Sequence, residues 1–286
     1  MLAQQIINGF ALGSVYALLA LGLTLVFGVL LIPNFAHGEL YMLGAFFTYM
    51  LVAAGWNFWL AALVATLGVV IVGIILDAIA FRPLEGKPAL TMMISALGAA
   101  IILQQVATLL WGSDSRTTPN PISGSISNGF FIVTYFQLFI FALLFACWGA
   151  VWLVLNRSRL GLAIRAVAQN RVAAQLMGVD LNMTRIGTFA IGAAIGGLAG
   201  ALLGATLPIY PTMGINPILK AFVVLVIGGV GSLWGAVLGG LVLGMAEVLV
   251  AGYISSEMQD IGTFLILVVL LLVKPEGLLG RAEVER

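Results

Sequence analysis

Four polar side chains interrupt stretches of sequence that are otherwise apolar. Asn34, His37 and Glu39 lie in PNFAHGEL, between two long apolar runs, and Glu247 lies well inside another. Ionisable groups at membrane depth are costly, so they usually face a cavity or a partner helix. These four residues are therefore the candidates for lining a path through the protein.

A second role is open for each of them. Pro33 and Gly38 can break a helix, and the three side chains of PNFAHGEL can then hydrogen-bond the freed backbone groups. A broken helix also exposes backbone groups that can meet a carboxylate or an ammonium group. The residues alone favour the structural role, because nothing in the sequence shows these side chains facing a path. For Glu247 they likewise favour a hydrogen bond to a neighbouring helix.

Other kinds of chemistry have few residues to be built from. The chain has one histidine and one cysteine, Cys147, and it contains no HExxH, GxSxG or P-loop pattern. A lone cysteine gives neither a disulfide framework nor a thiol metal site. We therefore predict no catalytic residues, no metal site and no cofactor bound by this chain. Asp77, five residues before Arg82, is expected to be a solvated charge at a helix end.

A basic segment occupies residues 156–185 and reads NRSRLGLAIRAVAQNRVAAQLMGVDLNMTR. It holds five of the twelve Lys and Arg residues of the chain and a single acid. Uncharged runs long enough to span a bilayer lie on both sides of it, so the segment is expected on the cytoplasmic surface. We assign residues 156–183 to a cytoplasmic loop.

One continuous helix is predicted within this loop. Strong helix formers precede Gly178, which stands where a helix stop belongs, and Asp180 or Asn182 is expected to cap the next span. The apolar face carries small alanine side chains, which suit insertion into a groove on another protein. An amphipathic helix lying on lipid headgroups is the alternative. The candidate docking residues are Arg165, Ala166, Gln169, Asn170, Ala173, Leu176 and Gly178.

Membrane-spanning helices must position these groups. The chain has 286 residues, of which 62% are hydrophobic and 8% charged, whereas soluble domains carry roughly 25% charged residues. Its long uncharged runs suit helices that cross a ~30 Å hydrocarbon core, and the alternation of a membrane β-barrel is absent. We predict one all-α polytopic membrane domain over residues 1–286, with eight or nine transmembrane or half-membrane helices. The spans are placed at 5–31, 36–54, 58–80, 90–111, 134–155, 184–207, 217–231, 235–253 and 258–273.

The basic residues also set the orientation. Placing residues 156–185 inside puts residues 82–89 and the tail from Lys274 inside, and it puts the loop 112–133 outside. Ten of the twelve basic residues then face the cytoplasm, and Arg116 and Lys220 are left outside. We expect a multi-pass protein of the bacterial inner (plasma) membrane.

Two sets of glycines repeat every four residues and remove side chains from one face of a helix. This spacing lets helix backbones approach closely, within the subunit or between subunits. The predicted packing glycines are Gly192, Gly196, Gly200, Gly231, Gly235 and Gly239.

Three long stretches resemble one transporter family. RAVAQNRVAAQLMGVDLNMTRIGTFAIGAAIGGLAGAL resembles the coupling segment of the branched-chain amino-acid ABC permeases, the first of their two membrane subunits. INGFALGSVYALLALGLTLVFGVLLIPNFAHGELYMLGAF resembles the N-terminal signature, and VLVIGGVGSLWGAVLGGLVLGMAE resembles the Gly-rich C-terminal signature. The likeness covers essentially the whole chain in order, and Pro33 and Trp234 are minor departures.

The resemblance implies an ABC importer permease fold and a defined set of partners. A second, different permease would pair with this chain to form the translocation pathway for branched-chain or related amino acids. Two ATPase subunits beneath them would bind ATP and Mg, and an external binding protein would deliver the solute. The segment from Arg165 to Gly178 would dock into an ATPase, and the N-terminal signature would lie near the pathway.

Two alternatives stay open at this stage. A self-contained secondary transporter or channel for a small polar solute would need functional charges in several spans, and it would leave the basic segment without a use. Within the ABC class, a urea or small-carboxylate permease is the other possibility, since nothing in this sequence fixes the solute.

Overall fold

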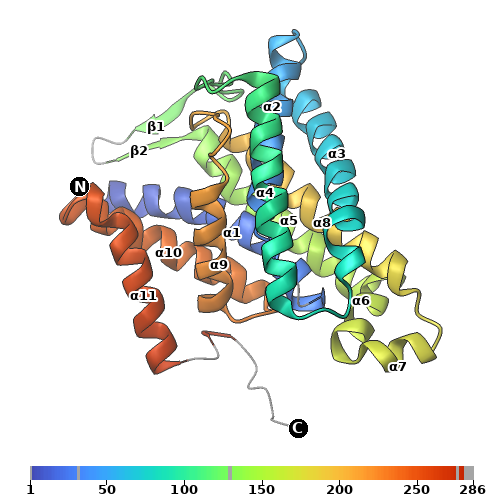
Figure 1. The fold of residues 1–286 in the computed structure, drawn as a ribbon. Helices are drawn as coiled ribbons and strands as arrows, with labels where there is room; N and C mark the ends of the chain where they lie inside the picture. The colour runs from blue at the N-terminus through green and yellow to red at the C-terminus, as the bar shows by residue number, and fades with distance from the viewer. Residues whose placement is uncertain (1, 31–32, 128–130, 275–276, 280–286) are drawn as a thin grey trace.

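The computed structural model describes residues 2–30, 33–127, 131–274 and 277–279, and it is a bundle of helices (Figure 1). Seven helical stretches in the described part are long and apolar enough to cross a membrane. The helices are α1 (Leu2–Leu30), α2 (His37–Ala53), α3 (Phe58–Leu76), α4 (Ala89–Trp111), α5 (Tyr135–Arg157), α6 (Arg159–Gln169), α7 (Arg171–Leu176), α8 (Leu181–Leu203), α9 (Ile215–Gly228), α10 (Leu233–Tyr253) and α11 (Gln259–Val273).

The predicted all-α membrane fold is confirmed, and each predicted span corresponds to one helix. Of the two helices at the spans predicted over 217–231 and 235–253, α9 is short, with 14 residues, whereas α10 has 21. The third span continues beyond α3 through a π-helical turn, Asp77–Phe81, and a 3-10 turn, Arg82–Leu84.

Polar side chains fix where several helices begin. Asn57 accepts a hydrogen bond from the backbone N–H of Trp59 at the start of α3. Thr134 and Gln137 form a reciprocal capping box at the start of α5. Such caps satisfy backbone donors that have no partner within the helix.

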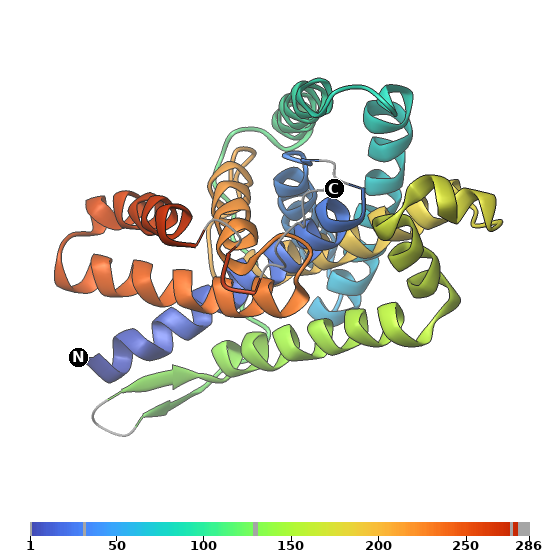
Figure 2. The same cartoon turned by 90° about the horizontal axis from the view of Figure 1, so that it is seen from below.

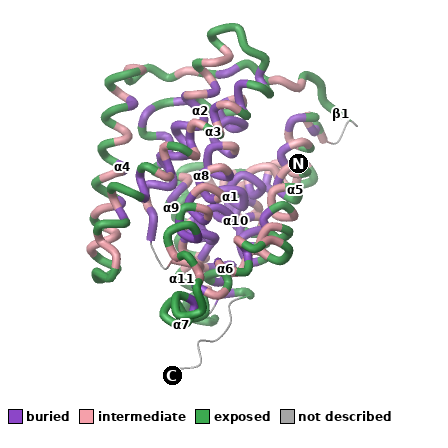
Figure 3. Tube along the Cα trace, turned by 90° about the vertical axis from the view of Figure 1, so that its right-hand side faces the viewer, coloured by how far each residue is buried: buried purple, intermediate pink, exposed green. Residues whose placement is uncertain are grey.

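The centre of the bundle is formed by α1, which packs against α10, and by α8, which packs against α2 and α3. Figure 3 shows the buried residues concentrated in the middle of the bundle, along α1 and α8. Glycines let the backbones meet: a Cβ on Gly44 would lie 2.1 Å from the carbonyl oxygen of Gly197, and one on Gly244 would lie 2.2 Å from the backbone nitrogen of Gly13. Close backbone packing of this kind holds helices together in lipid, where burial of apolar surface gives little drive.

Helix α4 lies at the edge of the bundle (Figures 2 and 3) and exposes most of its apolar side chains. A few polar contacts attach it. Gln104 Nε2 donates to Glu39 Oε1 at 2.7 Å, and Ser95 Oγ donates to the Ala80 carbonyl oxygen at 2.7 Å.

The predicted outer loop folds against the connection between α8 and α9. It carries a short antiparallel hairpin of β1 (Ser125–Ser127) and β2 (Ile132–Thr134). Arg116 and Ile209 exchange both backbone hydrogen bonds, at 2.9 and 2.7 Å, and the Thr118 N–H donates to the Gly204 carbonyl at 3.0 Å. The outer loop and the α8–α9 connection are therefore joined through the main chain.

Candidate functional site

The segment predicted to dock is two helices rather than one. α6 ends at Gln169, and α7 begins at Arg171 after Asn170, whose backbone is extended at φ −157° and ψ 108°. The Asn170 side chain accepts from the Ala173 N–H at 2.9 Å and caps α7. The single continuous helix was therefore the wrong expectation, because the cap that asparagine offers competes with helix continuation. Figure 2 shows α6 and α7 projecting from one side of the bundle.

The inner face of α6 attaches this segment to the bundle. Ile164 and Val167 are buried, whereas Arg165 is exposed and donates to Asn156 Oδ1 at 2.7 Å. Gly161 permits the close approach, since a Cβ there would lie 2.2 Å from the Val154 carbonyl oxygen. Among the predicted docking residues Ala166 is half-buried, and the exposed ones are Arg165, Gln169, Asn170, Ala173, Leu176 and Gly178.

Large apolar side chains, not alanines, dominate the outer surface of α7. Leu176 is 83% exposed and Met177 is 85% exposed, and Val172 beside them is also exposed. Ala174 is buried against the bundle. The prediction of a small-residue outer face was therefore wrong. Because the helix breaks at Asn170, positions that would share one face of a continuous helix are separated between α6 and α7.

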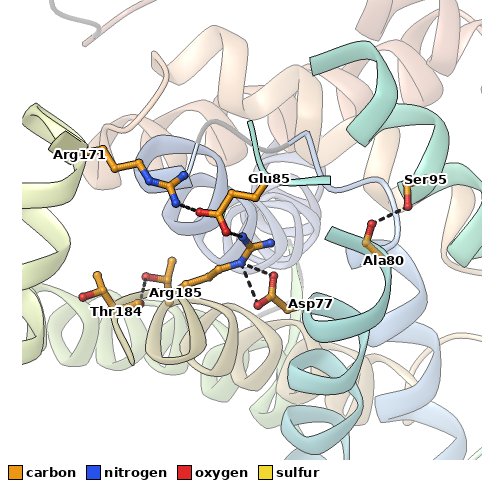
Figure 4. A network of polar contacts seen from close by, with 8 residues as sticks. Asp77, Ala80, Glu85, Ser95, Arg171, Thr184 and Arg185 are labelled. Atoms are coloured by element: carbon orange, nitrogen blue, oxygen red, sulfur yellow. Dashed lines mark hydrogen bonds and ion pairs between the residues drawn. The ribbon is translucent and has the colours of Figure 1, made fainter. Parts of the chain in front are cut away.

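An ion-pair chain connects α7 to the membrane helices (Figure 4). Arg171 pairs with Glu85, which follows the 3-10 turn. Glu85 Oε2 accepts from Arg185 Nη1 at 3.2 Å, and Arg185 Nε donates to the two Asp77 carboxylate oxygens at 2.7 and 3.0 Å. The chain thus joins α7, the α3–α4 connection, α8 and the end of α3.

Asp77 is not the solvated charge that the sequence suggested. It is 2% exposed and lies where α3 passes into the π-helical turn, facing Arg185 of α8, which is 5% exposed. Because the helix continues past Asp77, this residue remains inside the bundle instead of reaching solvent. Arg185 could have indicated this ion pair from the sequence, because an arginine buried near the start of a span requires a counter-charge.

The entry to α2 and its first turn place their polar side chains in the interior. Asn34, His37 and Glu39 are 2%, 0% and 1% exposed. The His37 ring fits between α1 and α8, where an added Cβ on Gly22 or Gly196 would lie 2.9 or 3.1 Å from its Nε2 atom.

The hydrogen bonds of this segment are not the ones that the structural role, favoured from the sequence, requires. Backbone carbonyls pair its N–H groups, with His37 donating to Asn34 at 3.3 Å and Glu39 donating to Ala36 at 3.1 Å. Within the described residues, the Asn34 amide and Glu39 Oε2 have no hydrogen-bond partner. Among the described residues, Asn34 and Glu39 therefore do not replace lost backbone bonds, and Glu39 contacts α4 through Gln104 instead.

Glu247 of α10 lies in a buried network that joins four helices. Its Oε2 atom accepts from Tyr16 Oη at 2.8 Å and from Gln259 Nε2 at 2.9 Å. Its Oε1 atom accepts from Thr263 Oγ1 at 2.5 Å and pairs with Lys220 Nζ at 2.9 Å. The structure thus shows the hydrogen bonds to neighbouring helices that the sequence favoured for Glu247.

Lys220 is part of α9 and its side chain is 12% exposed, so it is an interior ion-pair partner rather than an outer loop charge. Topological counting had left it outside because it lies near the outer end of the span predicted at 217–231. Burial of a lysine depends on an acid beside it, and the sequence does not show which acid becomes its neighbour.

The glycine sets pack within the chain. A Cβ on Gly200 would lie 1.8 Å from the Tyr41 carbonyl oxygen, and one on Gly235 would lie 2.1 Å from that of Gly228. Gly192 faces Val26, and Gly231 has φ +79°, a conformation that favours glycine. A Cβ on Gly239 would lie 2.9 Å from the Val224 carbonyl oxygen.

Comparison with known proteins identifies relatives along almost the full chain. Residues 5–274 match the family described as branched-chain amino acid transport system / permease component. The high-affinity branched-chain amino acid transport system permease protein LivH of Salmonella typhimurium is 38% identical, over 99% of this chain and 97% of its own. LivH of Escherichia coli K12 is 37% identical, and BraD of Pseudomonas aeruginosa, with the same description, is 38% identical, each over the same shares.

These relatives are transport permeases, in agreement with the apolar helices that make this chain a multi-pass membrane protein. The resemblance inferred from the three sequence stretches is confirmed, since the match includes all of them and the identity is spread over nearly the whole length. The chain belongs to the branched-chain amino acid transport permease family.

Proposed function

We propose that this chain is one permease subunit of an ATP-driven importer of branched-chain amino acids. In this proposal it forms the translocation pathway with a second, different permease. Two ATPase subunits bind ATP and Mg, and an external binding protein delivers the solute. Support comes from the family match and from relatives whose names state branched-chain amino acid transport.

The observation that carries the proposal is the α6–α7 segment. It exposes apolar side chains at Val172, Leu176 and Met177, and a soluble ATPase groove is a fitting environment for such side chains outside the bilayer. The ion pairs from Arg171 to Asp77 connect this surface to α3 and α8. A displacement of α7 by ATPase closure is therefore transmitted to helices of the membrane core.

The displacement of α7 would reach helices that contact buried polar residues. Asn34 is buried, His37 lies between α1 and α8, and Glu39 contacts α4. Helix α8 also carries Arg185 of the ion-pair chain. We assign these three residues to the neighbourhood of the solute pathway. Glu247 we assign to the helix network that holds α9 and α11 in place.

Purification of the chain from its native membrane in mild detergent, followed by mass spectrometry, tests the subunit composition. The proposal expects a second, different permease and P-loop ATPases in the same complex. Reconstitution of that complex with its binding protein should give leucine uptake that requires ATP. A homo-oligomer that transports a solute in liposomes without ATP would support the secondary transporter instead. ATP-driven uptake of urea or a carboxylate, without uptake of leucine, would show that the importer carries another solute.

Variants of the exposed surface test the coupling role. Leu176→Asp, Ala173→Trp and Arg165→Glu should each abolish uptake and ATPase recovery while the permease still inserts in the membrane. Ile126→Asp on the outer hairpin, where Ile126 is 47% exposed, is the matched control and should retain the ATPases. Normal uptake in all three α6–α7 variants would contradict docking at this surface.

A further inference from the structure

A cavity of about 210 Å³ lies beside the Glu247 network, between α1, α2, the α8–α9 connection and α9. Three tyrosines, Asn216 and Lys220 supply its polar lining, and the tyrosines are Tyr16, Tyr41 and Tyr210. Leu12, Val15 and Met213 supply apolar walls. The site therefore combines hydrogen-bond donors and one ammonium group with surface that suits an aliphatic side chain.

Two of the three tyrosine hydroxyls are available to a ligand. Tyr16 Oη donates to Glu247 and accepts from Lys220 Nζ at 3.2 Å, so its O–H is not free to donate to a ligand. Tyr41 is only 1% exposed, yet in the described part of the chain its hydroxyl makes no hydrogen bond, and neither does that of Tyr210. The Tyr41 hydroxyl lines the cavity from a buried side chain and can donate to a ligand there, whereas the Tyr210 side chain is 38% exposed and can also be hydrated.

Lys220 holds one fixed and one exchangeable carboxylate. Glu247 is fully buried and is held by Tyr16, Gln259 and Thr263, whereas the Asp260 side chain, 3.1 Å from Lys220 Nζ, is 62% exposed. An ion pair with so exposed a partner contributes little to stability. A ligand carboxylate can therefore replace Asp260 at Lys220 while the Glu247 pair stays intact.

The charges of this cluster also select the type of ligand. One ammonium group against two carboxylates leaves one negative charge in excess. A simple anion would add to that excess, while a zwitterion brings its own ammonium group and keeps the charge unchanged.

We propose that this cavity binds the transported α-amino acid, with the substrate carboxylate between Lys220 Nζ and Tyr41 Oη and the aliphatic side chain against Leu12, Val15 and Met213. The inference rests on the proposed import function and adds a substrate-binding site to it. It also gives Lys220 a role beyond the pairing of Glu247.

Cysteine protection in the purified complex tests this site directly. Cys147 is the single native cysteine, so Cys147→Ser gives a cysteine-free permease to which Asn216→Cys is added. A methanethiosulfonate reagent should label this cysteine at least five times more slowly in saturating leucine. Leucinol, which lacks the carboxylate, and 4-methylpentanoate, which lacks the ammonium group, should not protect. Thr212→Cys, which is exposed outside the cavity lining, is the control and should label equally with and without leucine.

Two conservative variants link protection to the named groups. Tyr41→Phe removes only the hydroxyl and should raise the leucine concentration for half-protection about tenfold. Tyr49→Phe is the control on the same helix, because Tyr49 stacks its ring under Arg116 and lies outside the cavity lining. Lys220→Gln should remove protection, and recovery of the intact complex by gel filtration checks its folding.

The outcomes separate this site from the general function. ATP-dependent leucine uptake with no protection, or with equal protection by leucinol and leucine, would overturn the site and leave the import function standing. Unchanged half-protection in Tyr41→Phe would also overturn it. Absence of leucine uptake together with absence of protection would remove both.

Discussion

Arg185→Ala should destabilise the bundle because it leaves a buried acid without its partner. Asp77, with its side chain 3% exposed, loses both hydrogen bonds from Arg185 Nε. Removal of one member of a buried ion pair costs about 3–5 kcal/mol, since the remaining charge stays desolvated. Glu85 loses less, because its side chain is 31% exposed and Arg171 remains beside it.

Asp77→Asn should cost less than Arg185→Ala. The asparagine carbonyl still accepts from Arg185 Nε, and Glu85 still pairs with Nη1. A lost charge-assisted hydrogen bond of this kind corresponds to about 1.5–3 kcal/mol. The double variant Asp77→Asn/Arg185→Ala carries no charge at this position and should be more stable than the sum of the two single changes predicts.

The free energy of unfolding, measured by titrating mixed micelles with a denaturing detergent, is a suitable assay for all three variants. Arg157→Ala is the control, because Arg157 is an exposed basic residue of the same cytoplasmic region. A loss in Arg185→Ala no larger than that of the control would refute the reasoning. Strict additivity in the double variant would show that Asp77 and Arg185 do not depend on each other.

Four further changes test packing and capping. Gly200→Val should destabilise the fold by more than about 3 kcal/mol, since even a Cβ there would lie 1.8 Å from the Tyr41 carbonyl oxygen. Gly98→Ala in α4, where nothing lies within 4 Å of an added Cβ, should stabilise the fold by up to about 1 kcal/mol. Thermal unfolding in detergent compares the two variants, and equal effects would contradict the packing. Asp180→Ala removes the α8 cap and should cost about 1 kcal/mol in the same assay, with no effect expected if the cap is unimportant. Asn170→Ala removes the α7 cap and should lower uptake per ATP hydrolysed in the reconstituted importer, whereas an unchanged ratio would show that the break is not needed for coupling.

Hydropathy and turn chemistry were sufficient to predict where the spans begin and end. The α3 span was predicted at 58–80 and the structure has α3 with its π-helical turn ending at Phe81. Asp180, one of two candidate caps, accepts from the first N–H groups of α8. These features depend on neighbours in sequence, so a local pattern contains them.

The partners of the interior charges could not be predicted in the same way. Asp77 and Arg185 are separated by 108 positions, and their contact depends on which helices become neighbours. The same holds for Lys220 and Glu247. Matching each interior base to an interior acid would have indicated that such pairs exist, although it would not have assigned them. The break at Asn170 was missed because good helix formers lie on both sides and outweigh one capping side chain in any averaged propensity.

The bridge between Arg116 and Ile209 has a consequence for the exchange of outer loops between related permeases. Its bonds, and the bond from Thr118 to Gly204, use main-chain atoms only. The bonds themselves therefore do not depend on the side chains at 116 and 118, although Arg116 also lies over the Tyr49 ring and Thr118 is buried. Proline at either position would remove the N–H that donates. A loop grafted from a related permease therefore needs to keep the backbone spacing that forms these bonds.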